Sequence, residues 1–245
     1  MGVYLRTEAQ VITTPWIYHN ASLWLISLSS DWSTRYTIAD KNLGATQVYN
    51  SWDTLSEANC GKYYQWGNNY WFPYTWSITT SSTKVNAWTY WPWNYYSSGI
   101  FILWQYRDSS QSANLWWWTT WTVGAMQWPC SSWFHIPKNT EWATLVQTWI
   151  TLGSRTSSWW TAFSQYMKLP LSWYRNWASS GQTSSQWSNW RYTTSIQYDY
   201  RYSYYITFSS SSISTNIWEY KTMWFSIRPF KNEAVQPDTS WTKLN

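Results

Sequence analysis

The five residues Tyr198-Asp-Tyr-Arg-Tyr202 carry side chains that could recognise a ligand. Tyrosine rings are rigid and largely apolar, while the hydroxyl, carboxylate and guanidinium groups among them can form directional hydrogen bonds. This mixture is typical of a recognition surface. The alternative is that these residues are the outward side chains of an ordinary tyrosine-rich strand. The chemistry that this segment predicts is binding rather than reaction.

Other residues that could do chemistry lack the partners that such chemistry requires. His135 could act as a base, but no Ser or Cys nucleophile with an orienting acid is implied near it, so we interpret it as structural. The two cysteines and two histidines are too far apart in sequence for a zinc motif. Gln236-Pro-Asp238 has the letters of a calcium-dependent sugar site, but no second cluster of oxygen ligands accompanies it. We predict no metal and no cofactor.

The composition is that of an extracellular protein rich in strands and loops. Only 11% of the 245 residues are charged, whereas 23% are aromatic. The net charge is +5, but the 16 Lys and Arg residues are scattered singly, so we expect no nucleic-acid partner. No stretch reaches the ~18 apolar residues of a transmembrane helix. Cys60 and Cys130 allow at most one disulfide, and their pairing is open.

Tryptophan is unusually frequent in this chain, and glycine is unusually rare. There are 28 Trp and 8 Gly, and tryptophan occurs in turn-like stretches such as Trp91-Pro-Trp93 and Gln186-Trp-Ser-Asn-Trp190. The neighbours there are those that glycine usually has in turns. Our hypothesis is an alternative genetic code in which UGA, read here as tryptophan, stands for glycine at many positions. UGG codons for Trp133, Trp190 and Trp224 would contradict it.

One sustained helical pattern predicts a helix over about residues 138–150. Its apolar residues have the spacing i, i+3, i+4, i+7 and i+8, and they are Trp142, Leu145, Val146, Trp149 and Ile150. Pro137 precedes the helix, and Glu141 in the first turn faces its positive end. Lys138 stands where a Ser or Thr cap would be, so only half of a capping box is present.

Two strands are predicted to close the domain, at residues 204–209 and 223–228. In the first, the even-numbered side chains are expected to be buried, and in the second the odd-numbered ones, because alternation indicates a sheet with one buried face. Residues 210–221 between them are polar and are expected to be flexible. We expect Arg228 to form fixed hydrogen bonds to backbone or a carboxylate, and Trp66 and Trp142 to lie in the core.

The chain is expected to contain one α+β domain, over residues 31–232. Residues 1–30 hold short apolar runs and are interpreted as strands of a leader or as the end of a preceding module. Residues 70–127 are biased toward Ser, Thr, Tyr and Trp and are interpreted as a long surface insertion. Residues 233–245 are a tail or linker.

Five motifs in a fixed order resemble the FISUMP family, the "major paralogous domain" of bacterial surface proteins and lipoproteins. They are Asp40-Lys-Asn-Leu-Gly-Ala-Thr46, Gly61-Lys-Tyr-Tyr-Gln-Trp-Gly67, the stretch from Pro129 to Trp142, Tyr174-Arg-Asn176 and Trp224-Phe-Ser-Ile-Arg-Pro229. The resemblance covers about residues 31–232. The family pattern has glycine where Trp133, Trp190 and Trp224 stand, which the genetic-code hypothesis explains.

This resemblance implies a C-type-lectin-like fold with small antiparallel sheets, one main helix and long irregular loops. In that fold, loops of the final strands form the ligand face, as in the variable proteins of diversity-generating retroelements. Here those loops would be residues 192–203 and 214–221. The candidate ligand-binding residues are Tyr192, Tyr198, Asp199, Tyr200, Arg201, Tyr202, Asn216, Glu219 and Tyr220.

The function that the resemblance implies is non-catalytic recognition or adhesion at the cell surface, toward a protein or glycan on another surface. Formylglycine-generating enzymes share the fold, but they need reactive cysteines in the C-terminal half, and this chain has none after Cys130. We therefore expect no enzyme. One alternative is a purely structural module of a larger envelope protein. Another is a carbohydrate-binding module that stacks sugar rings on exposed tryptophans, although many exposed indoles would promote aggregation.

Overall fold

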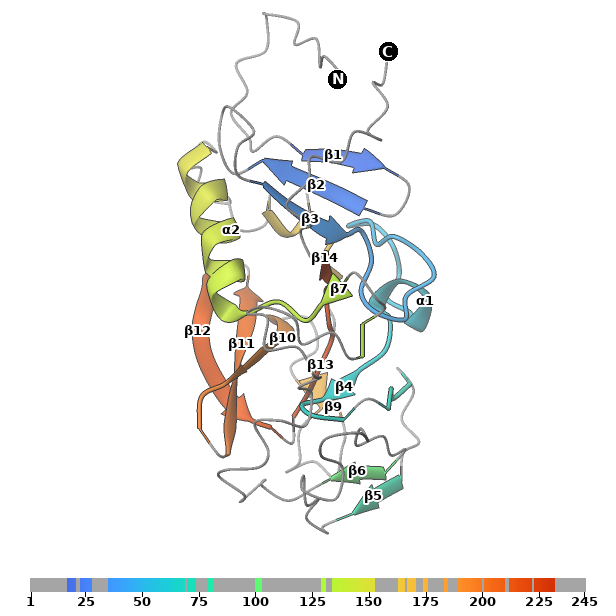
Figure 1. Ribbon diagram of the computed structural model, residues 1–245. Helices are drawn as coiled ribbons and strands as arrows, with labels where there is room; N and C mark the ends of the chain where they lie inside the picture. Colours follow the sequence, from blue (N-terminus) through green and yellow to red (C-terminus); the bar gives the residue numbers. More distant parts are fainter. Residues whose placement is uncertain are drawn as a thin grey trace, which may run out of the picture.

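The computed structural model describes part of the chain, which forms small sheets with few helices in an α+β arrangement (Figure 1). Most of the insertion over residues 70–127 and all of the tail over residues 233–245 lie outside the described residues. The residues that the structure describes are 17–20, 23–27, 35–68, 70–73, 79–81, 100–102, 129–130, 134–152, 163–165, 167–170, 174–175, 183–184, 189–199, 201–209, 212–221 and 223–231.

The largest sheet has five strands, which come from both the early and the late parts of the chain. In spatial order they are β1 (Ile17–Asn20), β2 (Leu23–Ser27), β3 (Arg35–Ala39), β14 (Phe230–Lys231) and β7 (Phe134–His135). β2 pairs with β3 along its whole length, from Leu23 opposite Ala39 to Ser27 opposite Arg35. Residues 17–20 and 23–27, expected to be strands of a leader or the end of a preceding module, are therefore strands of the same sheet as β3, β14 and β7.

A three-stranded antiparallel sheet carries the candidate ligand-binding residues. It consists of β10 (Asn189–Gln197), β11 (Tyr202–Ser209) and β12 (Ile213–Tyr220), with β11 in the middle. The expectation of loops over residues 192–203 and 214–221, and of a flexible segment over 210–221, is wrong, because most of these residues are strand. Their Thr, Ile and Tyr side chains suit a pleated surface, and β11 pairs with a strand on each side. Of the described residues, 198, 199 and 201 lie in the turn between β10 and β11.

The remaining sheets are smaller. One has the order β4 (Tyr64–Gln65), β13 (Trp224–Phe225), β8 (Tyr174–Arg175) and β9 (Thr183–Ser184), and another pairs β5 (Thr79–Ser81) with β6 (Ile100–Ile102) in parallel. β13 lies between β4 and β8, and Ser226 forms a bridge to Tyr192 of β10. Residues 223–228 are consequently all buried, so the expected single buried face is wrong there.

Helix α2 (Asn139–Leu152) confirms the predicted helix and packs against the three-stranded sheet (Figure 1). Trp142, Leu145 and Val146 are buried, whereas the side chains of Trp149 and Ile150 lie outside the described residues. The Trp142 ring lies 5.8 Å from the Phe208 ring and 5.1 Å from the Phe230 ring, centroid to centroid. Trp142 thus joins the helix to two sheets, and its predicted place in the core is confirmed. Trp66 is also in the core, with 1% of its surface exposed.

Glu141 fixes the start of α2. Its carboxylate accepts a hydrogen bond from the backbone N–H of Lys138 at 2.7 Å, which is the expected half of a capping box. The same carboxylate lies 3.0 Å from Nε2 of His135, the last residue of β7. His135 therefore joins strand β7 to the first turn of the helix.

The buried face of β11 changes from one side of the strand to the other. Ile206 and Phe208 lie in the core with Trp142 of α2. Tyr205, on the opposite face, packs against Met223 and Phe225, with its ring centroid 5.1 Å from that of Phe225. The expected burial of every even-numbered side chain is therefore wrong, because α2 covers one half of the strand and residues 223–225 cover the other. Next to the turn, the face that carries Tyr202 and Tyr204 is only partly buried.

Cys60 and Cys130 are free thiols, and both are completely buried. Cys60 ends the short helix α1 (Glu57–Cys60). Burial raises the pKa of Cys60 to about 12, and burial also raises the pKa of Cys130. A thiol that stays protonated is a poor nucleophile, so neither cysteine is reactive in the folded state.

Candidate recognition surface

The turn at residues 198–201 is held by its own backbone and by Asp199. The N–H groups of Tyr198 and Asp199 both donate to the carbonyl oxygen of Tyr202, at 2.9 and 3.2 Å. Oδ1 of Asp199 accepts hydrogen bonds from the N–H groups of Arg201 and Tyr202, at 2.7 and 2.9 Å. Asp and Asn commonly stabilise turns in this way. One oxygen of the Asp199 carboxylate is therefore engaged in shaping the turn.

Five aromatic side chains from the turn, β11 and β12 lie against one another, and we call this group the aromatic face. The Tyr198 ring stacks on Trp218 with the centroids 5.3 Å apart and the planes 13° apart. The Tyr202 ring lies 4.6 Å from both Trp218 and Tyr220. Tyr204 meets the Tyr198 ring edge-on at 5.4 Å. Aromatic pairs prefer such offset or edge-on geometries, so the rings hold one another in place.

Strand register explains why these rings gather on one side of the sheet. Tyr202 is opposite Tyr220, and Tyr204 is opposite Trp218, so all four side chains point to the same face. In Figure 1 the turn between β10 and β11 lies at the end of the sheet away from α2, so the helix does not cover this part. Tyr198 is 49% exposed and Trp218 is 46% exposed. A hydrogen bond with Tyr220 raises the pKa of Tyr202, so this phenol stays neutral at ordinary pH.

The structure brings only part of the predicted site together. Tyr198, Tyr202 and Tyr220 belong to the aromatic face, with Asp199 and Arg201 in the adjoining turn. Asn216 is exposed on the same strand as Trp218. Tyr200 lies outside the described residues.

Two predicted ligand-binding residues are placed elsewhere. Tyr192 is fully buried, and its hydroxyl donates to the carbonyl oxygen of Pro170 at 3.1 Å, so it is a core residue. Glu219 is opposite Ser203 and therefore lies on the other face of the sheet, where its carboxylate is 3.9 Å from Nη1 of Arg191. Both corrections follow from the strands that replace the expected loops, because neighbouring strand residues point to opposite faces.

Trp218 is the functional candidate that the sequence reasoning missed. Asn216, Trp218 and Tyr220 have the spacing of side chains on one face of a strand. This spacing places the three side chains on one face only if residues 213–220 form a strand, and the sequence analysis assigned them to a loop.

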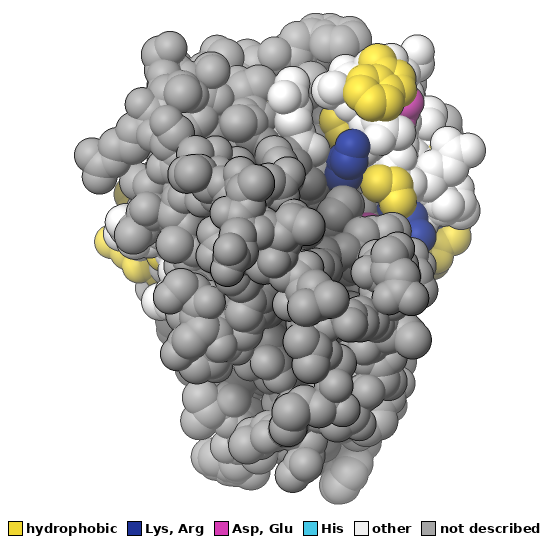
Figure 2. All heavy atoms as spheres, turned by 90° about the horizontal axis from the view of Figure 1, so that it is seen from above, with side chains coloured by type: hydrophobic (Ala, Val, Ile, Leu, Met, Phe, Trp, Pro, Cys, Tyr) yellow, Lys and Arg dark blue, Asp and Glu magenta, His cyan; other side chains and the backbone are white. Residues whose placement is uncertain are grey.

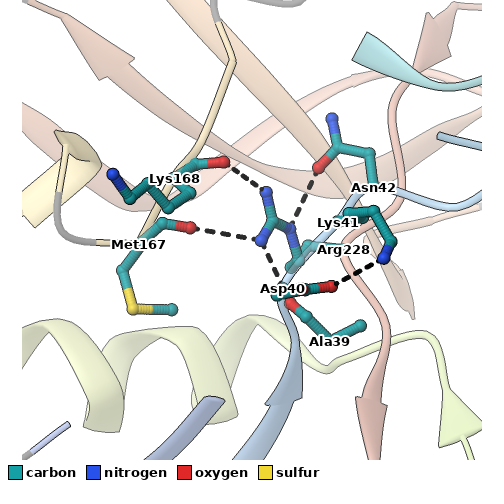
Figure 3. Close-up of polar contacts among 7 residues, drawn as sticks. All are labelled: Ala39, Asp40, Lys41, Asn42, Met167, Lys168 and Arg228. Atoms are coloured by element: carbon teal, nitrogen blue, oxygen red, sulfur yellow. Dashed lines mark hydrogen bonds and ion pairs between the residues drawn. The ribbon is translucent and has the colours of Figure 1, made fainter. Parts of the chain in front are cut away.

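Arg228 is completely buried and joins separate segments of the chain through a network of hydrogen bonds (Figure 3). Its Nη1 donates to the carbonyl oxygens of Ala39 and Met167, and its Nη2 donates to that of Lys168 at 2.8 Å. Nε donates to Oδ1 of Asn42 at 3.0 Å. The prediction that Arg228 forms fixed bonds to backbone groups is confirmed.

Backbone geometry bears on the tryptophans that stand where the family pattern has glycine. Among the described non-glycine residues, only Lys168 has a positive φ, of 49°. Trp190 and Trp224 are therefore in backbone conformations that any residue can adopt. Trp224 is buried and stacks on Phe72 with the ring centroids 4.0 Å apart. The backbone at these two positions does not require glycine.

Other exposed aromatic residues lie apart from the aromatic face and beside lysines. Trp52 is 80% exposed, and the Lys168 ammonium is 5.7 Å from its ring centroid. Trp71 is 45% exposed, and the Lys62 ammonium lies 4.0 Å from its ring. Figure 2, seen from above, shows hydrophobic side chains next to Lys or Arg side chains on the described part of the surface. Both are cation–π contacts, and Trp71 also stacks on Tyr70 with the ring centroids 5.8 Å apart.

No family model, no curated protein and no solved structure matches this chain. No helix in the part of the chain that the structure describes is both long and apolar enough to cross a membrane.

Proposed function

We propose that this protein is a non-catalytic recognition or adhesion domain, displayed at the cell surface, that binds a protein or glycan on another surface. The binding surface is the aromatic face with the turn at residues 198–201. The resemblance to FISUMP proteins supports this proposal. The proposed fold is C-type-lectin-like, in which a helix follows a Pro…Glu-Trp element, here Pro137 and Glu141-Trp142, and the final strands carry the ligand face.

The observation that carries the proposal is the stacked and half-exposed pair of Tyr198 and Trp218. Large rings that are exposed together and packed against other rings are the side chains that most often dominate binding energy in interfaces. Tyrosine and tryptophan lose little conformational entropy on binding because they have two rotatable bonds. In the aromatic face, neighbouring rings restrict even those bonds, so a ligand would meet a preorganised surface.

A glycan is the second candidate ligand class, and the stacked rings favour it. The apolar C–H face of a sugar ring packs well on the face of an indole or phenol, while the phenol hydroxyls can bond sugar hydroxyls. Because Tyr198 and Trp218 are stacked, each leaves only one ring face for a sugar, and the Tyr202 ring packs edge-on beside Trp218.

The test is binding of the purified protein to a glycan array and to intact bacterial and host cells. We expect binding that Tyr198→Ala and Trp218→Ala each weaken at least tenfold, because each removes half of the stacked pair. Trp52→Ala is the matched control, since it removes an exposed indole away from the aromatic face and should leave binding unchanged. Binding to cells without binding to the array would favour a protein ligand.

Two outcomes would contradict the proposal. If the protein binds neither the array nor any cell type, it is a structural module of a larger envelope protein. If Trp52→Ala weakens binding as much as Trp218→Ala, the surface is adhesive wherever an indole is exposed, and the aromatic face has no special role.

A further inference from the structure

The exposed ring of Trp52 has a lysine of the same chain over it. Nζ of Lys168 lies 5.7 Å from the Trp52 ring centroid and donates at 3.0 Å to Oδ1 of Asn50, two residues before the indole. The backbone of Lys168 has a positive φ of 49°, and its carbonyl oxygen accepts a hydrogen bond from Arg228. Residues other than glycine rarely adopt this conformation, and it costs energy. The lysine is therefore held beside the indole by a fixed and strained backbone.

A second lysine lies over the exposed ring of Trp71. Nζ of Lys62 is 4.0 Å from the Trp71 ring centroid and pairs with the Glu57 carboxylate. A side chain at Gly44 would collide with Cγ of Lys62, so the glycine leaves the space through which the lysine reaches the indole. Both arrangements have the same three parts, which are an indole, an ammonium over its ring, and a side-chain oxygen that accepts a hydrogen bond from the ammonium.

Trp218 has two of these three parts and lacks the ammonium. It is 46% exposed, and within the described part of the chain no Lys or Arg side chain lies over its ring or over the Tyr198 ring. Asn216 is exposed two residues before Trp218 on the same face of β12, which repeats the Asn-x-Trp spacing of the turn at Trp52. Among the described residues, the Asn216 amide forms no hydrogen bond. Alternate residues of a strand are ~7 Å apart, so one ammonium over the indole can reach this amide oxygen.

The charged groups beside the aromatic face do not add up to a net negative charge. Asp199 and Arg201 carry opposite charges, and Oδ1 of Asp199 accepts hydrogen bonds from two backbone N–H groups. Lys221 is completely buried, and burial lowers the pKa of Lys221 to about 7. A cation at Trp218 would therefore be attracted by the ring and by an amide oxygen rather than by a general negative field. Binding of such a cation should change little with salt concentration.

We propose that the aromatic face binds a lysine side chain of a partner protein, whose ammonium lies over the Trp218 ring and donates to Oδ1 of Asn216. The partner supplies the part that two lysines of this chain supply at the other exposed indoles. A quaternary ammonium has no N–H to donate to the amide, and a neutral sugar has no charge for the ring. The methylene groups of the lysine pack on the neighbouring rings. This inference rests on the proposed function and narrows its ligand from a protein or glycan to a protein that displays lysine.

Synthetic peptides test the inference without knowledge of the partner. Fluorescent beads coated with the full chain are measured on surfaces that carry a glycine–serine peptide with a single lysine, so that many weak contacts add up. We expect binding that acetylation of the lysine, which removes its charge, weakens by about tenfold or more. Equal binding to the lysine and acetyl-lysine surfaces, or binding to neither, would overturn the inference. Stronger binding to a trimethyl-lysine surface would assign the site to a quaternary ammonium and also overturn it.

Substitutions at exposed positions separate this site from the general properties of the surface. Asn216→Asp places a carboxylate beside the indole and should strengthen binding to the lysine peptide about threefold, with no gain for the acetylated peptide. Trp218→Leu should weaken binding about tenfold. Trp52→Leu is the matched control and should change nothing, because Lys168 already lies over that indole. An unchanged affinity in Asn216→Asp, or equal losses in Trp218→Leu and Trp52→Leu, would contradict the assignment of the site.

Cells that the protein binds distinguish this inference from the proposed function. Acetylation of the amines on their surface should weaken binding about tenfold, whereas reductive methylation, which keeps the charge, should leave most of it. Unchanged binding to acetylated cells would overturn the lysine inference and leave the recognition function intact. Binding to the lysine surface without binding to any cell would contradict the proposed function and support lysine recognition.

Discussion

Arg228 illustrates how a single residue can hold several segments of a small-sheet protein together. Its guanidinium donates to four oxygen atoms from two distant parts of the chain, residues 39–42 and residues 167–168. Burial lowers the pKa of Arg228, but arginine remains protonated because its ordinary pKa is so high. The planar fork matches several acceptors at once, which the single ammonium of a lysine cannot do.

Replacing Arg228 tests the value of this network. We expect Arg228→Met to lower the free energy of unfolding by about 3 kcal/mol, because four buried or partly buried hydrogen bonds are lost. Urea unfolding followed by circular dichroism measures the change. Lys41→Met is the control, since Lys41 is a partly exposed side chain 3.4 Å from Asp40, and its loss should cost less than about 1 kcal/mol. Equal losses in the two variants would show that burial of the Arg228 network adds nothing.

The elements of this fold were not equally predictable from the sequence. Helix α2 was predictable from the sequence, because Pro137, Glu141 and the apolar spacing from Trp142 are local signals that agree with one another. The strands at residues 192–197 and 213–220 were not predictable, because their Ser, Thr and Asn residues are common in loops. Their strand structure depends on pairing with β11, which brings together residues that no local pattern connects. The misplacement of Tyr192 and Glu219 and the omission of Trp218 all follow from that one error.

The change of buried face within β11 was also beyond a local pattern. Ile206 and Tyr205 are neighbours on opposite faces, and both are buried because different elements cover the two halves of the strand. The alternation of apolar and polar residues in a single strand cannot show which neighbouring element covers each half of that strand. The tryptophans present a similar problem, since the described backbone accepts Trp190 and Trp224, and only the codons decide whether glycine belongs there.

The start of α2 gives a prediction at the scale of one element. Glu141→Ala should lower the free energy of unfolding by about 1 kcal/mol, because the Lys138 N–H and the His135 ring lose their acceptor. Glu141→Gln keeps an oxygen acceptor at the same place and should cost less. Thermal unfolding of the three proteins at one pH measures the difference. If Glu141→Gln is as destabilising as Glu141→Ala, the negative charge rather than the hydrogen bond stabilises the helix.

For the whole molecule, the buried ionisable groups predict a maximum of stability near pH 9. Lys221 is neutral in the folded protein above about pH 7 but stays protonated in the unfolded chain up to 10.5, so stability rises with pH in that window. Above pH 9.0 the thiols of Cys60 and Cys130 ionise in the unfolded chain only, so stability falls. Two thiols lower the stability more per pH unit than the one amine raises it, so the free energy of unfolding decreases as the pH rises further.

Urea unfolding between pH 6 and pH 10 checks this profile. From pH 7 to pH 9 we expect a rise on the order of 2 kcal/mol in the free energy of unfolding. Lys221→Met should remove the rise. The double substitution Cys60→Ala and Cys130→Ala should move the maximum to higher pH, although the two small cavities will lower stability at every pH. A flat profile in the wild-type protein would mean that these groups are solvated in the folded state.

The exchange of buried faces along β11 has a consequence for how the protein can vary. Because one half of the hairpin is anchored by α2 and the other by residues 223–225, the outward rings near the tip contribute little to the interior packing of the fold. Positions 198, 202 and 218 can therefore accept new side chains while the scaffold behind them stays intact. A randomised library at these three positions should yield many folded members, from which new binding specificities could be selected.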